Sequence, residues 1–133
     1  MEQWARAGAL IQIDTHVLIW LAERRIASLS PKALRLAERE DLEISPMVVM
    51  ELETLRESGK LKNEPDRLVE VVKRDFGLGW STATFADVIA SARAFAWTRD
   101  PFDRLIVANA MADGARLLTA DETILANFRD AVW

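Results

Sequence analysis

Four carboxylates lie at places along the chain where a strand pattern ends, a helix begins or the apolar face of a helix should be. They are Asp14, Glu51, Asp103 and Asp121. In an open parallel sheet, ligands gather at the carboxyl ends of the strands. An ionised carboxylate near a buried surface is costly unless a positive charge compensates it. Hard carboxylate oxygens suit Mg²⁺ or Mn²⁺, so the four acids predict a divalent-metal site.

The segment around Glu51 predicts a helix that begins at Ser45 and Pro46 and ends near 58–59. Ser45 is the expected N-cap, and proline is favoured at the first helical position. At about 100° per residue, Glu51 falls on the edge of an apolar stripe, whereas Glu53 and Glu57 point away from it. Glu51 is therefore the acid of this helix that needs a compensating partner.

The other acids each have a structural interpretation as well. Asp100 is the expected N-cap before a proline, and Asp103 in the first turn complements the helix dipole. Near Asp121, Thr119 and Glu122 fit a capping box. Each acid taken singly is better explained as a cap or a solvated residue, but four such coincidences are needed to explain all of them.

Three pieces of sequence carry a family resemblance: 13–20, 99–105 and 118–122, in this order and with Ser45 and Glu51 between them. Together they resemble the PIN-domain nucleases, and within these the toxin component of VapBC toxin–antitoxin pairs. The resemblance implies that the acidic quartet is catalytic and binds Mg²⁺ or Mn²⁺. It also implies supporting positions for Ser45, Thr119 and Asp100.

The activity that the resemblance implies is a metal-dependent endoribonuclease cutting single-stranded or loop RNA, as the toxin of a type II toxin–antitoxin pair. Its implied partners are the RNA substrate, a second copy in a homodimer and a VapB-like antitoxin whose C-terminal segment blocks the acidic pocket. A different interpretation stays open, in which the chain is a catalytically silent PIN-fold module that binds RNA or protein. Retention of four acids favours the enzyme, because a silent module has no use for unpaired carboxylates.

Composition is consistent with one cytoplasmic domain. The chain has 133 residues, of which 50% are apolar, so we expect a single domain over 1–133 with an N-terminal extension at 1–9. It has no cysteine, which excludes disulfides, thiolate zinc sites and a cysteine nucleophile and suits a reducing cytoplasm. Apolar runs are far below membrane-spanning length, and the first residues lack the basic start of a signal peptide. The net charge of −4 is unusual for a nucleic-acid binder, but an acidic metal site accounts for the sign.

Strand and helix patterns alternate along the chain. The sequence predicts strands at 10–14, 42–45, 78–81 and 116–119, with 131–133 as an optional edge strand, and helices at 15–23, 30–40, 46–58, 64–77, 84–96 and 102–113. Strands separated by helices form mostly parallel sheets covered on both faces. The predicted fold class is therefore α/β, a three-layer α/β/α PIN-like domain with a mostly parallel central sheet of four to five strands.

The remaining candidates for chemistry are aromatic or basic. His16, the only histidine, is expected to be a packing residue rather than a general base. The five tryptophans are expected to form core or dimer contacts, while stacking of Trp97 on an RNA base is the less favoured alternative. Basic residues that can contact phosphate are Arg24, Arg25, Lys60, Lys62, Arg99 and Arg104.

Overall fold

Five short parallel strands form the centre of the fold, in a computed structural model that describes residues 10–133. They are β1 (Leu10–Ile13), β2 (Asp41–Ile44), β3 (Leu78–Trp80), β4 (Arg116–Leu118) and β5 (Ala131–Val132). The strand order is β3-β2-β1-β4-β5, and every neighbouring pair is parallel. Ile11, Ile13 and Leu117 are fully buried, as expected for strands covered on both faces. The predicted parallel sheet is confirmed, while the predicted extension at 1–9 lies outside the described residues.

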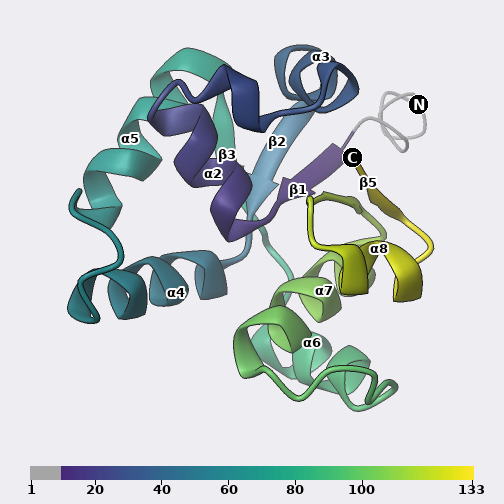
Figure 1. Cartoon of the computed structure of the whole chain (residues 1–133). Coiled ribbons are helices and arrows are strands. Elements are labelled where there is room, and N and C mark those ends of the chain that lie inside the picture. The colour runs from purple at the N-terminus through teal and green to yellow at the C-terminus, as the bar shows by residue number, and fades with distance from the viewer. Residues whose placement is uncertain (1–9) are drawn as a thin grey trace.

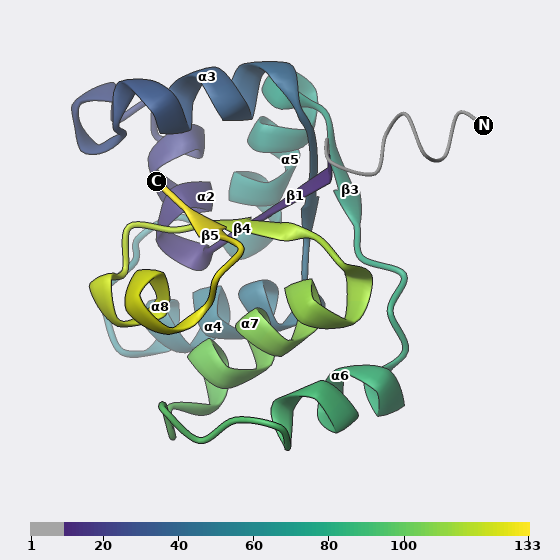
Figure 2. The ribbon, with the colours of Figure 1, turned by 90° about the vertical axis from the view of Figure 1, so that its right-hand side faces the viewer.

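Helices cover both faces of this sheet (Figures 1 and 2). The helices are α2 (Thr15–Ala22), α3 (Pro31–Arg39), α4 (Pro46–Glu57), α5 (Pro65–Phe76), α6 (Phe85–Ala92), α7 (Pro101–Asp113) and α8 (Glu122–Asn127), with a 3-10 turn η1 (Ile26–Ser28). Helices α2, α3 and α5 lie on one side of the sheet, and α6, α7 and α8 lie on the other. Helix α4 follows β2 and contacts α2, α5 and α7. The predicted three-layer α/β/α fold is confirmed.

Local signals in the sequence determine where several helices begin and end. The Ser45 hydroxyl accepts the backbone N–H of Met47, and the Asp100 carboxylate accepts two N–H groups in the first turn of α7. Both predicted N-caps are thus confirmed. At the other end of α7, Gly114 adopts the left-handed conformation at φ +62°, which glycine reaches without steric cost.

Helix α6 ends at Ala92, four residues before the predicted end. The carbonyl oxygen of Ala92 accepts a hydrogen bond from Arg104 Nε at 3.0 Å. Beyond it, the Phe95 and Trp97 rings stack with centroids 5.2 Å apart. A side chain from α7 therefore occupies the carbonyl that a further helical turn would have used, and the chain leaves the helix to pack these two rings.

The start of α8 also differs from the predicted capping box. Asp121, rather than Thr119, is the N-cap, because its Oδ1 accepts the N–H groups of Thr123 and Ile124 at 2.8 and 3.1 Å. The Thr119 hydroxyl instead accepts the N–H of Asp121 at 3.1 Å. Thr119 is therefore available for a contact outside α8.

A buried polar network connects α7 to the sheet. Asp113 Oδ2 accepts hydrogen bonds from Gln12 Nε2 and Ser81 Oγ, both at 2.5 Å, and from Asn109 Nδ2 at 3.3 Å. Gln12 and Asn109 are only 1% and 3% exposed, so these hydrogen bonds satisfy groups that water cannot reach. One carboxylate thus links β1, the segment after β3 and the end of α7.

The tryptophans divide between core and surface. Trp20, Trp97 and Trp133 pack against the core, which confirms the core prediction for them. Trp80 is 52% exposed, so the core interpretation is wrong there and only the dimer interpretation stays a prediction. Trp4 lies outside the described residues. Every helix in the described part of the chain is too short or too polar to cross a lipid bilayer.

Candidate active site

Asp14 lies directly after β1 and caps the first turn of α2. Its Oδ1 accepts the N–H of Thr15 at 2.8 Å, and its Oδ2 accepts the hydroxyl of Thr119 at 2.6 Å. The side chain is buried, with 8% of its residue surface exposed. Burial raises the pKa of Asp14 above its ordinary value, although both hydrogen bonds act in the opposite direction. The folded protein therefore disfavours the ionised form of Asp14.

Glu51 projects from the middle of α4 toward the same region. Its Oε1 accepts a 2.5 Å hydrogen bond from the hydroxyl of Thr15. Burial raises the pKa of Glu51, and the nearby charge of Asp14 raises it further. The edge position predicted for Glu51 is confirmed, because the Val48 and Leu52 side chains of the stripe are fully buried and Glu51 is half-buried.

Asp103, in the first turn of α7, also has a raised pKa. Its pKa is raised to about 7, first by burial and then by the negative charges of the surrounding acids, which are Asp100, Asp14, Asp121 and Glu51. This half-buried carboxylate therefore lies within electrostatic range of all four of these acids. The four predicted site acids thus come together, with Asp100 as a fifth nearby carboxylate.

Asp121 reaches the cluster through Thr119. The Thr119 hydroxyl accepts the Asp121 N–H and donates to Asp14, so one fully buried threonine connects the carboxyl end of β1 with the start of α8. Thr15 has the same function on the other side, because its N–H binds Asp14 and its hydroxyl binds Glu51. Thr15 therefore connects the carboxylates of Asp14 and Glu51, and Thr119 connects the Asp14 carboxylate to the backbone of Asp121.

No basic side chain neutralises this cluster in the described residues. None of the ion pairs between residues 10 and 133 includes Asp14, Glu51, Asp103 or Asp121. Within the same range, no three acidic or histidine side chains already stand in a coordinating arrangement. The acids are thus close enough to repel one another. Their oxygens are the hard donors that a small divalent cation prefers, but the side chains are not yet arranged as metal ligands.

The family model described as the PIN domain matches residues 11–130, nearly the whole chain. The chain belongs to the PIN domain family. PIN domains are generally nucleases, so the family places this chain among nucleases at a coarse level. The predicted resemblance is confirmed, and residues 14 to 121, over which the acids are spread, fall inside the matched range.

Two solved structures share the PIN fold with this chain. One is the crystal structure of VapBC2 from Rickettsia felis bound to a DNA fragment from their promoter, with a TM-score of 0.66, 15% identity and coverage of 92% of this chain and 96% of that one. The other is VapBC-1 from nontypeable Haemophilus influenzae, with a TM-score of 0.55, 14% identity and coverage of 93% and 96%. A comparison with curated protein sequences finds no significant match. At these identities the likeness is one of fold.

Two residues of this PIN domain were not assigned correctly from sequence. Thr15 was not singled out, although the adjacency of a hydroxyl residue to Asp14 was a signal that could have identified it. His16 was expected to pack in the interior, but its side chain is exposed. The imidazole is near enough to Asp14 and Glu51 to act against the rise of their pKa values that burial causes. Packing is therefore not the role of His16.

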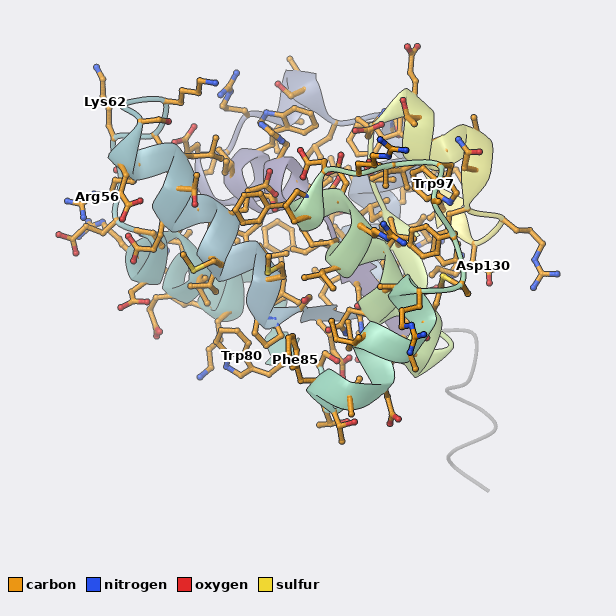
Figure 3. The ribbon with its side chains drawn as sticks, turned by 90° about the horizontal axis from the view of Figure 1, so that it is seen from below. Arg56, Lys62, Trp80, Phe85, Trp97 and Asp130 are labelled. Carbon is orange, nitrogen blue, oxygen red and sulfur yellow. The ribbon has the colours of Figure 1, made fainter. Side chains whose placement is uncertain are left out.

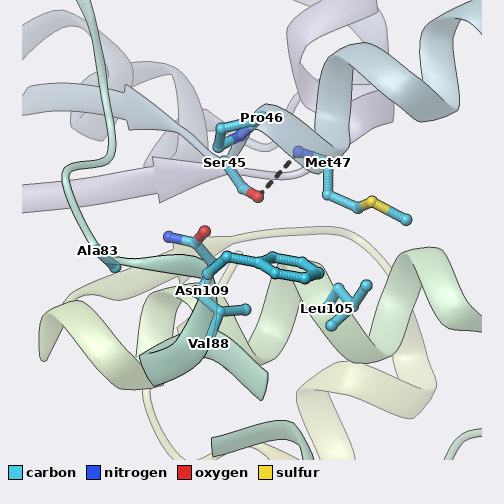
Figure 4. Close-up of a pocket in the computed structure, with 8 residues that line it drawn as sticks. Ser45, Pro46, Met47, Ala83, Val88, Leu105 and Asn109 are labelled. Atoms are coloured by element: carbon cyan, nitrogen blue, oxygen red, sulfur yellow. Dashed lines mark hydrogen bonds between the residues drawn. The ribbon is translucent and has the colours of Figure 1, made fainter. Parts of the chain in front are cut away.

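A cavity of about 220 Å³ lies between α4 and the α6–α7 pair of this PIN domain (Figure 4). Ser45 and Asn109 face it from opposite sides, and its other lining residues are apolar. Phe85 lines it and is 74% exposed, and Trp80, 52% exposed, is on the same side of the molecule (Figure 3). We call Met47, Trp80 and Phe85 the apolar face.

Proposed function

We propose that the chain is a divalent-metal-dependent endoribonuclease that cuts single-stranded or loop RNA, as the toxin of a type II toxin–antitoxin pair. The observation that carries the proposal is the meeting of four carboxylates, from β1, α4, α7 and the start of α8, without a basic partner among residues 10–133. Membership of the PIN domain family supports the nuclease chemistry.

The residues that would hold Mg²⁺ or Mn²⁺ are Asp14, Glu51, Asp103 and Asp121. The raised pKa values of three of them fit this role, because a carboxylate that burial and like charges destabilise gains from a nearby cation. When bound, such an ion supplies an activated water molecule and positive charge beside the scissile phosphate. Thr15 and Thr119 hold the carboxylates of Asp14 and Glu51 in place, so less ordering of these two side chains is needed on binding.

Cleavage should depend on the metal. We expect wild-type protein to stop cutting single-stranded RNA after exhaustive treatment with a chelator, and to recover with Mg²⁺ or Mn²⁺ but not with Ca²⁺. The reason is that the looser coordination of Ca²⁺ suits in-line attack poorly. Gel analysis of an end-labelled RNA measures this, and cleavage that survives chelation would contradict the proposal.

Calorimetric titration with Mn²⁺ separates the enzyme from a catalytically silent PIN-fold module. The enzyme should bind Mn²⁺ in the wild-type form, whereas the absence of binding supports the silent module. The same titration on Asp121→Asn tests whether this acid, whose Oδ1 already caps α8, is also needed for the metal.

A protein partner is part of the proposal. The structures from Rickettsia felis and Haemophilus influenzae are of VapBC proteins, and on this likeness we infer a cognate VapB-like antitoxin. A homodimer is proposed from the family resemblance of the sequence. The apolar face offers exposed aromatic surface of the kind that protein partners cover. Sedimentation of the purified chain measures the dimer.

The antitoxin should insert an arginine into the acidic cluster. The planar guanidinium can pair bidentately with a carboxylate, and the cluster has no such partner in the described chain. Replacing that arginine should relieve inhibition of cleavage more than it weakens binding of the antitoxin. Inhibition that is indifferent to every basic residue in the antitoxin's C-terminal segment would rule this out.

A further inference from the structure

A second groove, of about 380 Å³, lies next to the acidic cluster, between α2 and the segment that joins α4 to α5. Three basic side chains line it, namely Arg25, Lys60 and Lys62. His16 and Trp20 also line it, with their rings 6.1 Å apart. Figure 3 shows Lys62 extending into solvent from this side of the molecule, well away from Trp80 and Phe85. The groove therefore combines positive charge with aromatic surface.

Within residues 10–133, neither Lys60 nor Lys62 has an ion-pair partner. Both residues are exposed. The acid in the groove is Glu23, which pairs with Arg25 at 3.5 Å and accepts a hydrogen bond from Asn63 at 3.1 Å. The groove thus keeps two ammonium groups for an external anion.

Two residues that line the groove lie close in sequence to acids of the cluster. His16 lies two residues after Asp14, and its imidazole is electrostatically coupled to both Asp14 and Glu51. On the opposite wall, Leu55 follows Glu51 by one helical turn of α4. A strand whose phosphate reaches the acids would therefore continue into the groove.

We propose that this groove binds the RNA strand on one side of the scissile phosphate, with Lys60 and Lys62 contacting phosphates and the exposed ring of His16, which lies against Trp20, stacking on a base. Basic residues along a backbone path, combined with aromatic rings for bases, are the physical requirements for holding single-stranded nucleic acid. The aromatic rings favour RNA over an acidic peptide, which would use only the charges. This inference rests on the proposed function and names where its substrate lies.

The salt dependence of RNA binding tests the lysines. Binding of a fluorescein-labelled single-stranded RNA is measured by anisotropy at several salt concentrations, in a chelator and in the uncleaving Asp14→Asn background. Each lysine–phosphate contact contributes about 0.7 to the slope of log K against log salt. Adding Lys60→Ala and Lys62→Ala should therefore weaken RNA binding and make the negative slope shallower by about 1.4.

The matched control is the pair Lys32→Ala and Lys73→Ala, which changes net charge equally. Both control lysines are exposed, and Lys73 lies beside Leu10 and Asp41 at the amino ends of the strands, the opposite edge of the sheet. The control pair should leave the slope unchanged. Equal slopes for the two pairs, or lysine-dependent binding of a poly-glutamate peptide without any binding of RNA, would overturn the proposal.

A separate variant tests the proposed stacking of an aromatic ring on a base. His16→Ala, at an exposed position, should lower RNA affinity about fivefold without changing the salt slope, as expected for loss of roughly 1 kcal/mol of stacking. Thermal melts confirm that each variant is folded. If wild-type protein cuts RNA with Mn²⁺ but the lysine pair keeps its slope, the groove assignment fails and the proposed function stands. If the slope falls but no metal supports cleavage, the groove stands and the proposed function fails.

Discussion

Asp14→Asn is expected to abolish RNA cleavage while leaving the metal-free protein at least as stable as wild type. Asparagine keeps the shape and is an equally good N-cap, so the hydrogen bond from Thr15 can persist. The substitution removes a buried negative charge whose raised pKa shows that the folded protein disfavours it. Activity should fall by on the order of a thousandfold or more, as for loss of an essential group in an active site. Cleavage assays and thermal melts in a chelator measure the two effects.

Matched variants on α4 sharpen this test. Glu51→Gln should behave like Asp14→Asn, because Glu51 is half-buried and its pKa is raised by burial and by Asp14. Glu57→Gln, at an exposed position on the same helix, should change neither activity nor stability. If Asp14→Asn melts below wild type in the chelator and still cuts RNA, Asp14 is a structural cap and the quartet is not a metal site.

The metal-free protein should become more stable as the pH falls from about 8 to about 5. Asp103 has a pKa of about 7 in the folded protein and an ordinary value of 3.8, so between these values the folded state binds the extra proton. Its contribution to stability is fully present below pH 3.8 and is lost as the pH rises through 7. Burial shifts the pKa values of Asp14 and Glu51 in the same direction. The expected result is a melting midpoint in chelator that rises by several degrees on acidification.

Saturating Mn²⁺ should reverse this dependence, because the cation binds the deprotonated carboxylates. At a concentration of about 100 times the Kd, a ligand that binds only the folded state adds about 2.7 kcal/mol. Asp103→Asn should flatten the pH dependence in chelator, whereas Asp87→Asn, in the exposed first turn of α6, should leave it as in wild type. Identical pH curves for wild type and Asp103→Asn would mean that Asp103 does not titrate near neutrality.

Helix boundaries were predictable where a short stretch of sequence determines them. Ser45, Asp100 and Gly114 act through backbone groups a few residues away, and the structure confirms the helix ends that they predict. The end of α6 was predicted wrongly because it depends on Arg104, twelve residues further along the chain. No local pattern near Ala92 contains that information.

The proximity of the acids was predictable, because parallel strands end at one edge of a sheet. The hydrogen bonds that hold their side chains were not predictable. The hydroxyl of Thr15 reaches Glu51 across 36 positions, and that of Thr119 reaches Asp14 across 105. His16 was misjudged because it is close in sequence to apolar residues. On the helix, however, Val17, Leu18 and Leu21 face the interior and His16 does not. Which face of α2 is buried depends on tertiary packing.

The order of the strands has a consequence for the protein while the ribosome is still making it. The middle strand β1 pairs with β4, and the Asp14 side chain is held by Thr119, so the first of the four site acids needs segments that are synthesised almost last. A nascent chain released before residue 116 lacks β4, Thr119 and Asp121. Contacts between such distant segments also form late in folding, since a long loop must close first. If the proposed site is the active site, an unfinished chain lacks one of its four carboxylates and should not cut RNA.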